Sequence, residues 1–237
     1  MKQFIEHAKK LVNINISPDQ MQAFQTYEDL LIEWNEKFNL TAIRERSQIR
    51  TKHFLDSLTC SLAWRDEIPA NLIDIGSGAG FPGIPLKIAF PVLEVVLVES
   101  IGKKASFCRH IIDTLNLKSI KVCTERVEVI GQNPQYREKF DFAVARAVAN
   151  LPTLAEYMLP LVKTGGLVLA QKGDGAEKEI HTAEKAIDLL GGRAKQLLPV
   201  RLPDVEGERF LVIIEKVKNT PSQYPRRVGV PSGKPLI

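Results

Sequence analysis

Hydrophobic residues from position 71 onward fall into short apolar runs that alternate with helix-like stretches. The apolar runs occupy 71–75, 93–99, 119–123, 140–145 and 166–171, and the helical stretches lie near 84–89, 103–115, 151–162 and 176–190. This alternation is typical of an α/β fold, in which helices cover both faces of a parallel sheet. Right-handed crossovers place the carboxyl ends of the strands along one rim, where ligands bind. Two later runs, 195–201 and 209–216, predict an antiparallel hairpin that closes the sheet.

The chain up to about residue 65 has a helical pattern instead. Proline follows Ser17, as at a helix N-terminus, and apolar residues then recur at helical spacing at Met21, Phe24, Leu31, Trp34 and Phe38. A further helix is expected from Ser47 onward. The chain therefore divides into a helical N-terminal subdomain (1–66), an α/β domain (67–218) and a C-terminal tail (219–237).

Composition limits the class of protein. A chain of 237 residues with 44% hydrophobic content can bury one substantial core. Cys60, Cys108 and Cys123 are an odd number without C-x-x-C spacing, so neither a disulfide framework nor a zinc site is indicated, and no metal is expected. The amino terminus has no signal-peptide core, and no apolar run approaches the roughly 20 residues of a membrane helix. We therefore expect a cytoplasmic protein with no membrane contact.

Positive charge is concentrated at the C-terminus. The net charge is +4, yet residues 216–237 contain five lysines or arginines and no acid: Lys216, Lys218, Arg226, Arg227 and Lys234. Four prolines in the same stretch disfavour a regular element, which predicts an extended, basic arm. Nucleic acid is a natural partner for such an arm, and a solvated terminus without a partner is the alternative.

A glycine-dense turn follows the first apolar strand. Gly76, Gly78 and Gly80 can adopt positive φ and carry no Cβ, so a nucleotide-like ligand can approach the main chain there. About 20 residues later a second strand ends at Glu99, the usual spacing for a carboxylate that binds the two hydroxyl groups of a ribose. Together these features indicate a cofactor that contains adenosine.

Two cofactors fit this loop. Residues 78–83 match the dinucleotide pattern G-x-G-x-x-G, which is weak by itself. Asp74, two positions before the first glycine, extends the pattern to Asp-x-Gly-x-Gly-x-Gly, which favours S-adenosylmethionine, because the carboxylate can face the amino group of that cofactor. The Tyr-x-x-x-Lys pair of many dehydrogenases does not occur at any of the four tyrosines, Tyr27, Tyr136, Tyr157 and Tyr224.

Several motifs occur in the order found in one known family. They are residues 34–41 (Trp-Asn-Glu-Lys-Phe-Asn-Leu-Thr), 53–58 (His-Phe-Leu-Asp-Ser-Leu), 74–86, 99–100, 103–104, 126–128, 145–147 and 207–209, followed by the proline-rich tail. Over nearly its whole length the chain resembles the RsmG family, also called GidB or glucose-inhibited division protein B. The resemblance implies a Rossmann-like methyltransferase domain with a helical N-terminal extension. It also implies an enzyme that uses S-adenosylmethionine to methylate N7 of a guanine in 16S ribosomal RNA of the small ribosomal subunit.

The resemblance also implies a set of site residues. Gly76, Phe81, Val127, Glu128 and Arg146 match cofactor contacts of the family, in addition to Asp74, Gly78, Gly80 and Glu99 from the loop pattern. Arg126, Arg146 and Arg209 match basic residues at or near the reaction centre. Arg126 has an alternative, because it could pair with Glu125 or Glu128. His53 lies among apolar residues and is expected to be a packed core residue outside the site.

The residues that the chain lacks are consistent with N7 as the methyl acceptor. Guanine N7 presents a lone pair, so positioning can supply most of the acceleration and no general base is required. An exocyclic amine would call for an Asn/Asp-Pro-Pro-aromatic loop after the fourth strand, where this chain has Arg146-Ala147-Val148-Ala149-Asn150. Cytosine C5 would call for a nucleophilic cysteine after a proline, a context that Cys108 and Cys123 do not have.

Two other classes of function stay open from the residues alone. One is a nicotinamide-dependent (NAD) oxidoreductase, which the missing Tyr-x-x-x-Lys pair disfavours. The other is a non-catalytic RNA-binding protein that senses S-adenosylmethionine, which would bind the cofactor without methyl transfer. A monomer is expected for the protein.

Overall fold

The fold is built on one mixed, seven-stranded sheet in the order β3-β2-β1-β4-β5-β7-β6. The computed structural model describes residues 1–64 and 67–237, and the expected subdomain boundary at residue 66 lies outside the described residues. The strands are β1 (Asn71–Ile75), β2 (Glu94–Val98), β3 (Ile120–Cys123), β4 (Phe140–Arg146), β5 (Val162–Lys172), β6 (Gly192–Val200) and β7 (Arg209–Lys216). The first five strands run parallel, and β7 is antiparallel to both β5 and β6.

The predicted α/β fold and the hairpin that closes its sheet are confirmed. The helices of the α/β part are α5 (Gly83–Ala89), α6 (Gly102–Thr114), α7 (Val127–Gln132), α8 (Leu151–Met158), η3 (Leu159–Leu161), α9 (Ala176–Leu189) and α10 (Val230–Gly233). The helix expected over 151–162 ends at Met158 and tightens into a 3₁₀ turn, because Pro160 cannot donate a helical hydrogen bond. The short α7 and α10 were not predicted, because six and four residues hold too little of a helical period.

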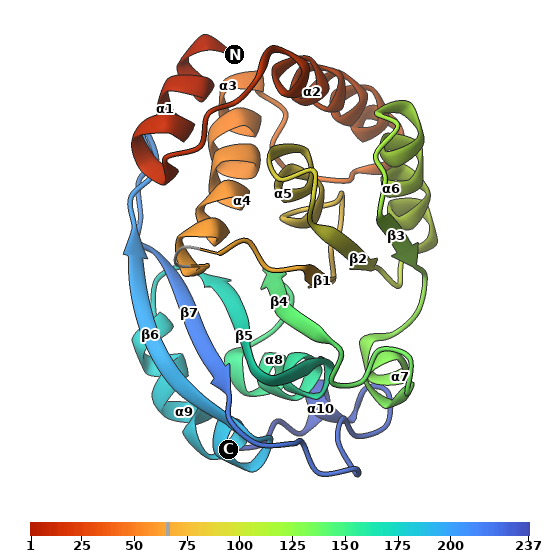
Figure 1. Ribbon diagram of the computed structural model, residues 1–237, viewed down its shortest axis with the longest axis vertical. Helices are drawn as coiled ribbons and strands as arrows, with labels where there is room; N and C mark the ends of the chain where they lie inside the picture. The colour runs from red at the N-terminus through yellow and green to blue at the C-terminus, as the bar shows by residue number, and fades with distance from the viewer. Residues whose placement is uncertain (65–66) are drawn as a thin grey trace.

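Helices cover both faces of the sheet, as Figure 1 shows, with α1 to α6 on one side and α7 to α10 on the other. Successive strand residues point to opposite faces. In β4, Phe142 and Val144 join the core beneath the N-terminal helices, whereas Ala143 and Ala145 join the core beneath α8 and α9. The same alternation puts five residues on the same face as the strand residues of the core beneath the N-terminal helices. They are Asp74, Glu99, Arg146, Gln171 and Arg209.

The N-terminal helices share their core with the sheet. They are α1 (Lys2–Val12), α2 (Pro18–Phe38), α3 (Arg46–Ile49), the π-helical turn η1 (Arg50–Leu55), α4 (Asp56–Leu58) and η2 (Thr59–Ala63). Ser17 and Gln20 form the capping box that begins α2, as the Ser17-Pro18 pair predicted. Phe54 of η1 is fully buried and packs against Phe24 and Tyr27 of α2. This packing fixes η1 and α4 against the rim of the sheet. No helix within residues 1–64 and 67–237 is long and apolar enough to cross a bilayer.

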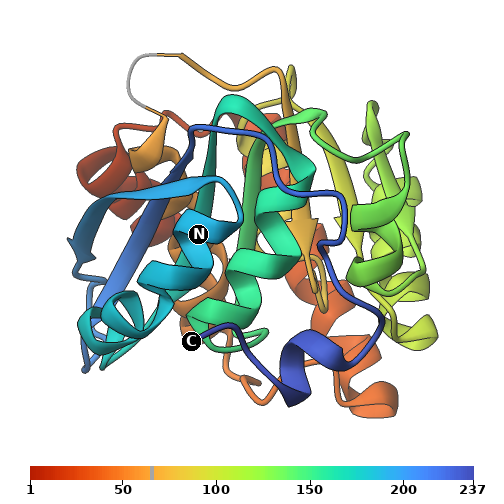
Figure 2. The same ribbon diagram turned by 90° about the horizontal axis from the view of Figure 1, so that it is seen from below.

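The C-terminal segment, residues 219–237, packs along the protein, and the prediction of an extended basic arm is wrong. Figure 2 shows this segment in dark blue, crossing the layer of α8 and α9 before it forms α10. Arg226 in this segment forms a 2.6 Å ion pair with the buried Glu156, and Lys216, the last residue of β7, is completely buried with its Nζ 3.1 Å from the Glu138 carboxylate. Buried charges need partners, and these two carboxylates provide them. Counting charges along the sequence therefore overestimated the positive charge that residues 216–237 present to solvent.

Arg226 should anchor the C-terminal segment. Its Nε and Nη2 donate to both oxygens of Glu156, so Arg226→Ala leaves a fully buried carboxylate without its cation. We expect a loss of about 3 kcal/mol in the free energy of unfolding, measured by urea denaturation. Arg227→Ala, at the exposed neighbouring position, is the matched control and should change stability by less than about 0.5 kcal/mol. Equal stabilities for the two variants would contradict this anchoring.

Candidate active site

The glycine loop that follows β1 adopts the backbone that its sequence predicted. Gly76, Gly78 and Gly80 have φ of 66°, 61° and 95°. A Cβ on Gly76 would lie 2.7 Å from Cγ2 of Val148, so a side chain there would collide with the loop after β4. The loop is held in place where the Gly76 N–H donates to the Val98 carbonyl at the end of β2. These contacts bring the carboxyl ends of β1, β2 and β4 close together.

Two buried carboxylates organise this loop. Glu99 accepts from the Gly78 N–H through Oε2 at 2.8 Å and from the Ile101 N–H through Oε1 at 2.7 Å. Asp74 is fully buried and accepts from the Gly83 N–H at 2.8 Å through Oδ2, while its Oδ1 has no hydrogen-bond partner. Burial raises the pKa of Asp74 to about 7, against the opposing effects of the Gly83 hydrogen bond and the Arg146 charge. Asp74 therefore carries an unused acceptor in an environment that disfavours its charge.

A cavity of about 240 Å³, here called the Gly76 cavity, opens beside this loop. Its walls come from the ends of β1, β2 and β4, from the start of α7 and from the C-terminal segment: Ile75, Gly76, Val98, Ser100, Glu125, Arg126, Val127, Glu128, Val148, Ala149, Tyr157 and Ser232. Four of the expected site residues, Gly76, Arg126, Val127 and Glu128, therefore meet at one cavity. Ser232 was not predicted, because only tertiary packing brings the C-terminal segment to this place.

Glu128 connects the Gly76 cavity to the C-terminal segment. Its Oε1 accepts from the Gly229 N–H at 2.9 Å and from the Tyr157 hydroxyl at 3.4 Å. Its Oε2 is buried without a hydrogen bond, and the Nε of the half-exposed Arg126 lies 3.6 Å away. The ion pair considered for Arg126 therefore does form, with Glu128, in the wall of this cavity.

Arg146 lies at the end of β4 and lines a second cavity of about 200 Å³, here called the Arg146 cavity. Its Nη1 donates to Asp56 Oδ2 at 3.0 Å and to the Lys52 carbonyl at 3.2 Å, and its guanidinium lies 5.0 Å from the centre of the Phe81 ring. Ion pairing with Asp56 and the ring of Phe81 both fix the plane of the guanidinium. Phe81, an expected cofactor contact, thus supports Arg146 in this structure.

His53 is a packed, hydrogen-bonded residue of the core, as expected, and it contacts Arg146 from there. Its ring stacks on Phe81 with centroids 4.5 Å apart, and its Nδ1 lies 3.2 Å from Nη2 of Arg146. An arginine can only donate, so Nδ1 is an acceptor and Nε2 carries the proton towards Thr41 Oγ1 at 2.7 Å. Burial and the Arg146 charge lower the pKa of His53 to about 3. The motif of residues 53–58 could have indicated that His53 and Asp56 contact the same partner, because it places the two residues within one helical turn.

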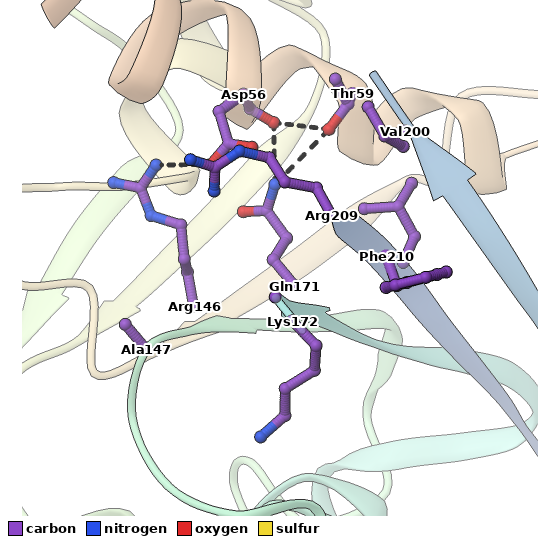
Figure 3. A pocket seen from close by; sticks show the side chains of 11 residues that line it. Asp56, Thr59, Arg146, Ala147, Gln171, Lys172, Val200, Arg209 and Phe210 are labelled. Carbon is purple, nitrogen blue, oxygen red and sulfur yellow. Dashed lines mark hydrogen bonds and ion pairs between the residues drawn. The ribbon is translucent and has the colours of Figure 1, made fainter. Parts of the chain in front are cut away.

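Arg209, at the start of β7, is the other arginine of the Arg146 cavity, as Figure 3 shows. The remaining walls are formed by Asp56, Thr59, Ala147, Gln171, Lys172, Gly173, Val200, Phe210 and Leu211. The Nε of Arg209 and the Oε1 of Gln171 are buried without hydrogen-bond partners. The structure thus brings Arg146 and Arg209 to one cavity and places Arg126 at the other.

The two cavities adjoin at the loop that follows β4. Arg146 and Ala147 line the Arg146 cavity, and the next two residues, Val148 and Ala149, line the Gly76 cavity. Ala147 adopts a left-handed φ of 55°, which turns the chain sharply between them. Among the described residues, no group of three or more His, Cys, Asp or Glu is placed to hold a metal ion.

The fold is that of S-adenosylmethionine-dependent methyltransferases. A methyltransferase of this kind from Aquifex aeolicus has a TM-score of 0.52 at 17% identity, over 73% of this chain and 94% of that one. The precorrin-6y C5,15-methyltransferase of Geobacter metallireducens has a TM-score of 0.51 at 11% identity, over 68% and 87% of the two chains.

The chain belongs to the GidB family, whose description is rRNA small subunit methyltransferase G. The family model matches residues 20–204. Proteins named ribosomal RNA small subunit methyltransferase G are similar over nearly the whole chain. That of Roseiflexus castenholzii is 50% identical over 94% of this chain and 95% of its own, and that of Alkaliphilus metalliredigens is 43% identical over 99% and 98%.

The buried neutral His53 should make stability depend on pH. Its pKa is about 3 in the folded protein and near 6.5 when unfolded, so its contribution is fully present above pH 6.5 and is lost as the pH falls towards 3. From pH 7 to pH 5 we expect His53 to account for a loss of about 2 kcal/mol in the free energy of unfolding. Urea denaturation at both pH values should give a smaller loss for His53→Gln than for the wild type. An equal loss in both proteins would contradict a neutral His53.

Proposed function

We propose that this protein transfers a methyl group from S-adenosylmethionine to N7 of a guanine in the 16S ribosomal RNA of the small ribosomal subunit. The observation that carries the proposal is the junction of two cavities at the loop after β4. One cavity has the glycine loop and acceptor groups suited to a cofactor, and the other has two arginines suited to a nucleotide. A methyl donor and an acceptor held in these cavities would meet beside Arg146.

The Gly76 cavity suits the adenosine of S-adenosylmethionine. Glu128 Oε2 is buried without a hydrogen bond in its wall, and Asp74 Oδ1 is likewise unpaired beneath the loop. Buried acceptors that lack a hydrogen bond favour a ligand that donates one, and this cofactor carries amino and hydroxyl donors; Glu128 Oε2 has only the 3.6 Å ion pair with Arg126. Glu99 holds the loop in shape, and each of its oxygens keeps a second lone pair for a ribose. When bound, the cofactor supplies a methyl group on a positively charged sulfur.

Positioning is the main contribution that we assign to Arg146. Guanine N7 needs no proton removed, and both ring nitrogens of the neutral His53 are already hydrogen-bonded. The reaction moves positive charge from sulfur onto the purine, so a nearby cation does not neutralise it. Arg146, held by Asp56 and Phe81, would instead orient the base through O6 or bind its phosphate. Arg209 would add a second cation for the same nucleotide, and Arg126 would act on the cofactor side.

The choice of substrate rests on family membership. The similar proteins are named ribosomal RNA small subunit methyltransferase G, and this chain matches them over almost its full length. A ribosomal substrate implies a cytoplasmic enzyme, and we expect it to act as a monomer. The proposal excludes a role for the C-terminal segment as a free RNA-binding arm, because that segment is packed against the protein.

One experiment distinguishes this function from its rivals. Purified protein is incubated with radiolabelled S-adenosylmethionine and small subunits that lack methylation, and the labelled nucleotide is then mapped. We expect label at N7 of a single guanine. Cofactor binding without transfer would favour a non-catalytic sensor, and equal affinity for NAD in calorimetry would favour an oxidoreductase.

Arg146 should act mainly on the rate of methyl transfer. Arg146→Ala is expected to lower the single-turnover rate by on the order of a hundredfold at saturating RNA and cofactor. Arg146→Lys should restore little of the lost rate, because lysine lacks the planar guanidinium that Asp56 and Phe81 contact. Thermal melting is the necessary control, because Asp56 is buried and loses its cation. A wild-type rate, or a loss explained by unfolding alone, would make Arg146 a structural residue.

Binding of the cofactor should release a proton from Asp74 below pH 7. The pKa of Asp74 is about 7 in this structure, so the group is mostly protonated at pH 6. A cationic amino group beside it favours the carboxylate, and affinity should therefore fall as the pH drops below 7. Calorimetry at pH 6 in two buffers with different heats of ionisation should detect release of nearly one proton. Asp74→Asn should abolish this release, and a proton count unchanged in the variant would refute the role.

A further inference from the structure

Gln171 lies directly beside Arg146 on the neighbouring strand. The two residues are Cα partners in the parallel pairing of β4 with β5, so their side chains point to the same face of the sheet. Gln171 is 8% exposed, and Figure 3 shows its amide in the Arg146 cavity, directed towards Asp56 and Thr59. Its position in the cavity is therefore set by the sheet.

The orientation of the Gln171 amide is set by its neighbours. Nε2 donates to the Asp56 carbonyl at 2.8 Å and lies 3.4 Å from the Thr59 hydroxyl oxygen. A carbonyl cannot donate, so the nitrogen must occupy this place and Oε1 must face the other way. Oε1 has no partner and is buried. A buried acceptor of this kind favours a ligand that carries an N–H group.

The order of groups along the rim matches the order of groups along one edge of guanine. From β1 across the sheet the structure places the glycine loop, then Arg146 on β4 and then Gln171 on β5. Around the edge of guanine, N7 is followed by O6 and then by N1–H. N7 directed at the cofactor would therefore set an acceptor against the arginine and a donor against the Gln171 oxygen.

We propose that Gln171 is the residue that reads the base as guanine, by accepting a hydrogen bond from N1–H while Arg146 donates to O6. The inference rests on the proposed function and assigns it a specificity-determining residue. Adenine also has an N7 acceptor, but it presents an amino donor in place of O6 and a bare acceptor at N1. Arg146 would then face a donor and Gln171 an acceptor, so adenine would leave both protein groups unpaired. Sites that read a base by hydrogen bonds reject its analogues strongly for this reason.

The test uses unmethylated small subunits that carry either the target guanine or an adenine in its place. Single-turnover rates on both substrates are measured for the wild type and two variants. Gln171→Met removes the acceptor with little change in size. Gln196→Met, at an exposed position on β6, is the matched control. The wild type should prefer guanine by roughly 10⁴-fold or more. Gln171→Met should lower the guanine rate by about 10- to 100-fold and leave the adenine rate unchanged, and Gln196→Met should match the wild type.

A merely structural role for Gln171 predicts a different result, because both rates would fall together and the preference would be kept. That outcome, or an unchanged guanine rate, would overturn the proposal. Gln171→Glu keeps an acceptor oxygen and should retain a higher guanine rate than Gln171→Met, and equal losses in the two variants would also overturn it. If the wild type methylates neither substrate, the result contradicts the proposed function, and with it the role of Gln171. Thermal melting and cofactor affinity confirm that each variant is folded.

Discussion

The guanidinium of Arg146 joins the two parts of the molecule from which the site is built. It extends from the sheet at the end of β4 and bonds to Asp56 and to the carbonyl of Lys52 in the N-terminal helices. Removal of a buried ion-pair partner is strongly destabilising, so neither the helices nor the rim can shift without disturbing the other. Arg146 and Asp56 both line the Arg146 cavity, and the neutral His53 and the ring of Phe81 contact the guanidinium.

The order of strands in the sheet separates the residues that we propose to bind the cofactor from those that we propose to bind the nucleotide. The glycine loop, Asp74 and Glu99 lie at the ends of β1 and β2, and the side chains that we propose to bind the nucleotide lie on β4, β5 and β7. Residues 146–149, at the end of β4 and in the loop that follows it, contribute to the walls of both cavities. A sheet of fixed register can therefore hold donor and acceptor in line, which is the contribution that a lone-pair nucleophile requires.

Strand positions, the hairpin that closes the sheet and the glycine loop could be predicted because each depends on local pattern. His53 and Ser232 could not be placed in the same way, since a buried histidine and an exposed serine are both ordinary until the chain is folded. The basic tail was wrongly predicted for a related reason: the partners of Lys216 and Arg226, Glu138 and Glu156, lie far away in the sequence. The site roles of the three arginines and the division at residue 66 stay predictions.

The central claim is that cofactor and base occupy separate, adjoining cavities. A crystal structure of the protein with S-adenosylhomocysteine tests it most directly. The account predicts the adenosine in the Gly76 cavity, against Val127, Glu128 and Ser232, with the Arg146 cavity left open to solvent. Adenosine bound against Arg146, Gln171 and Arg209 would contradict it.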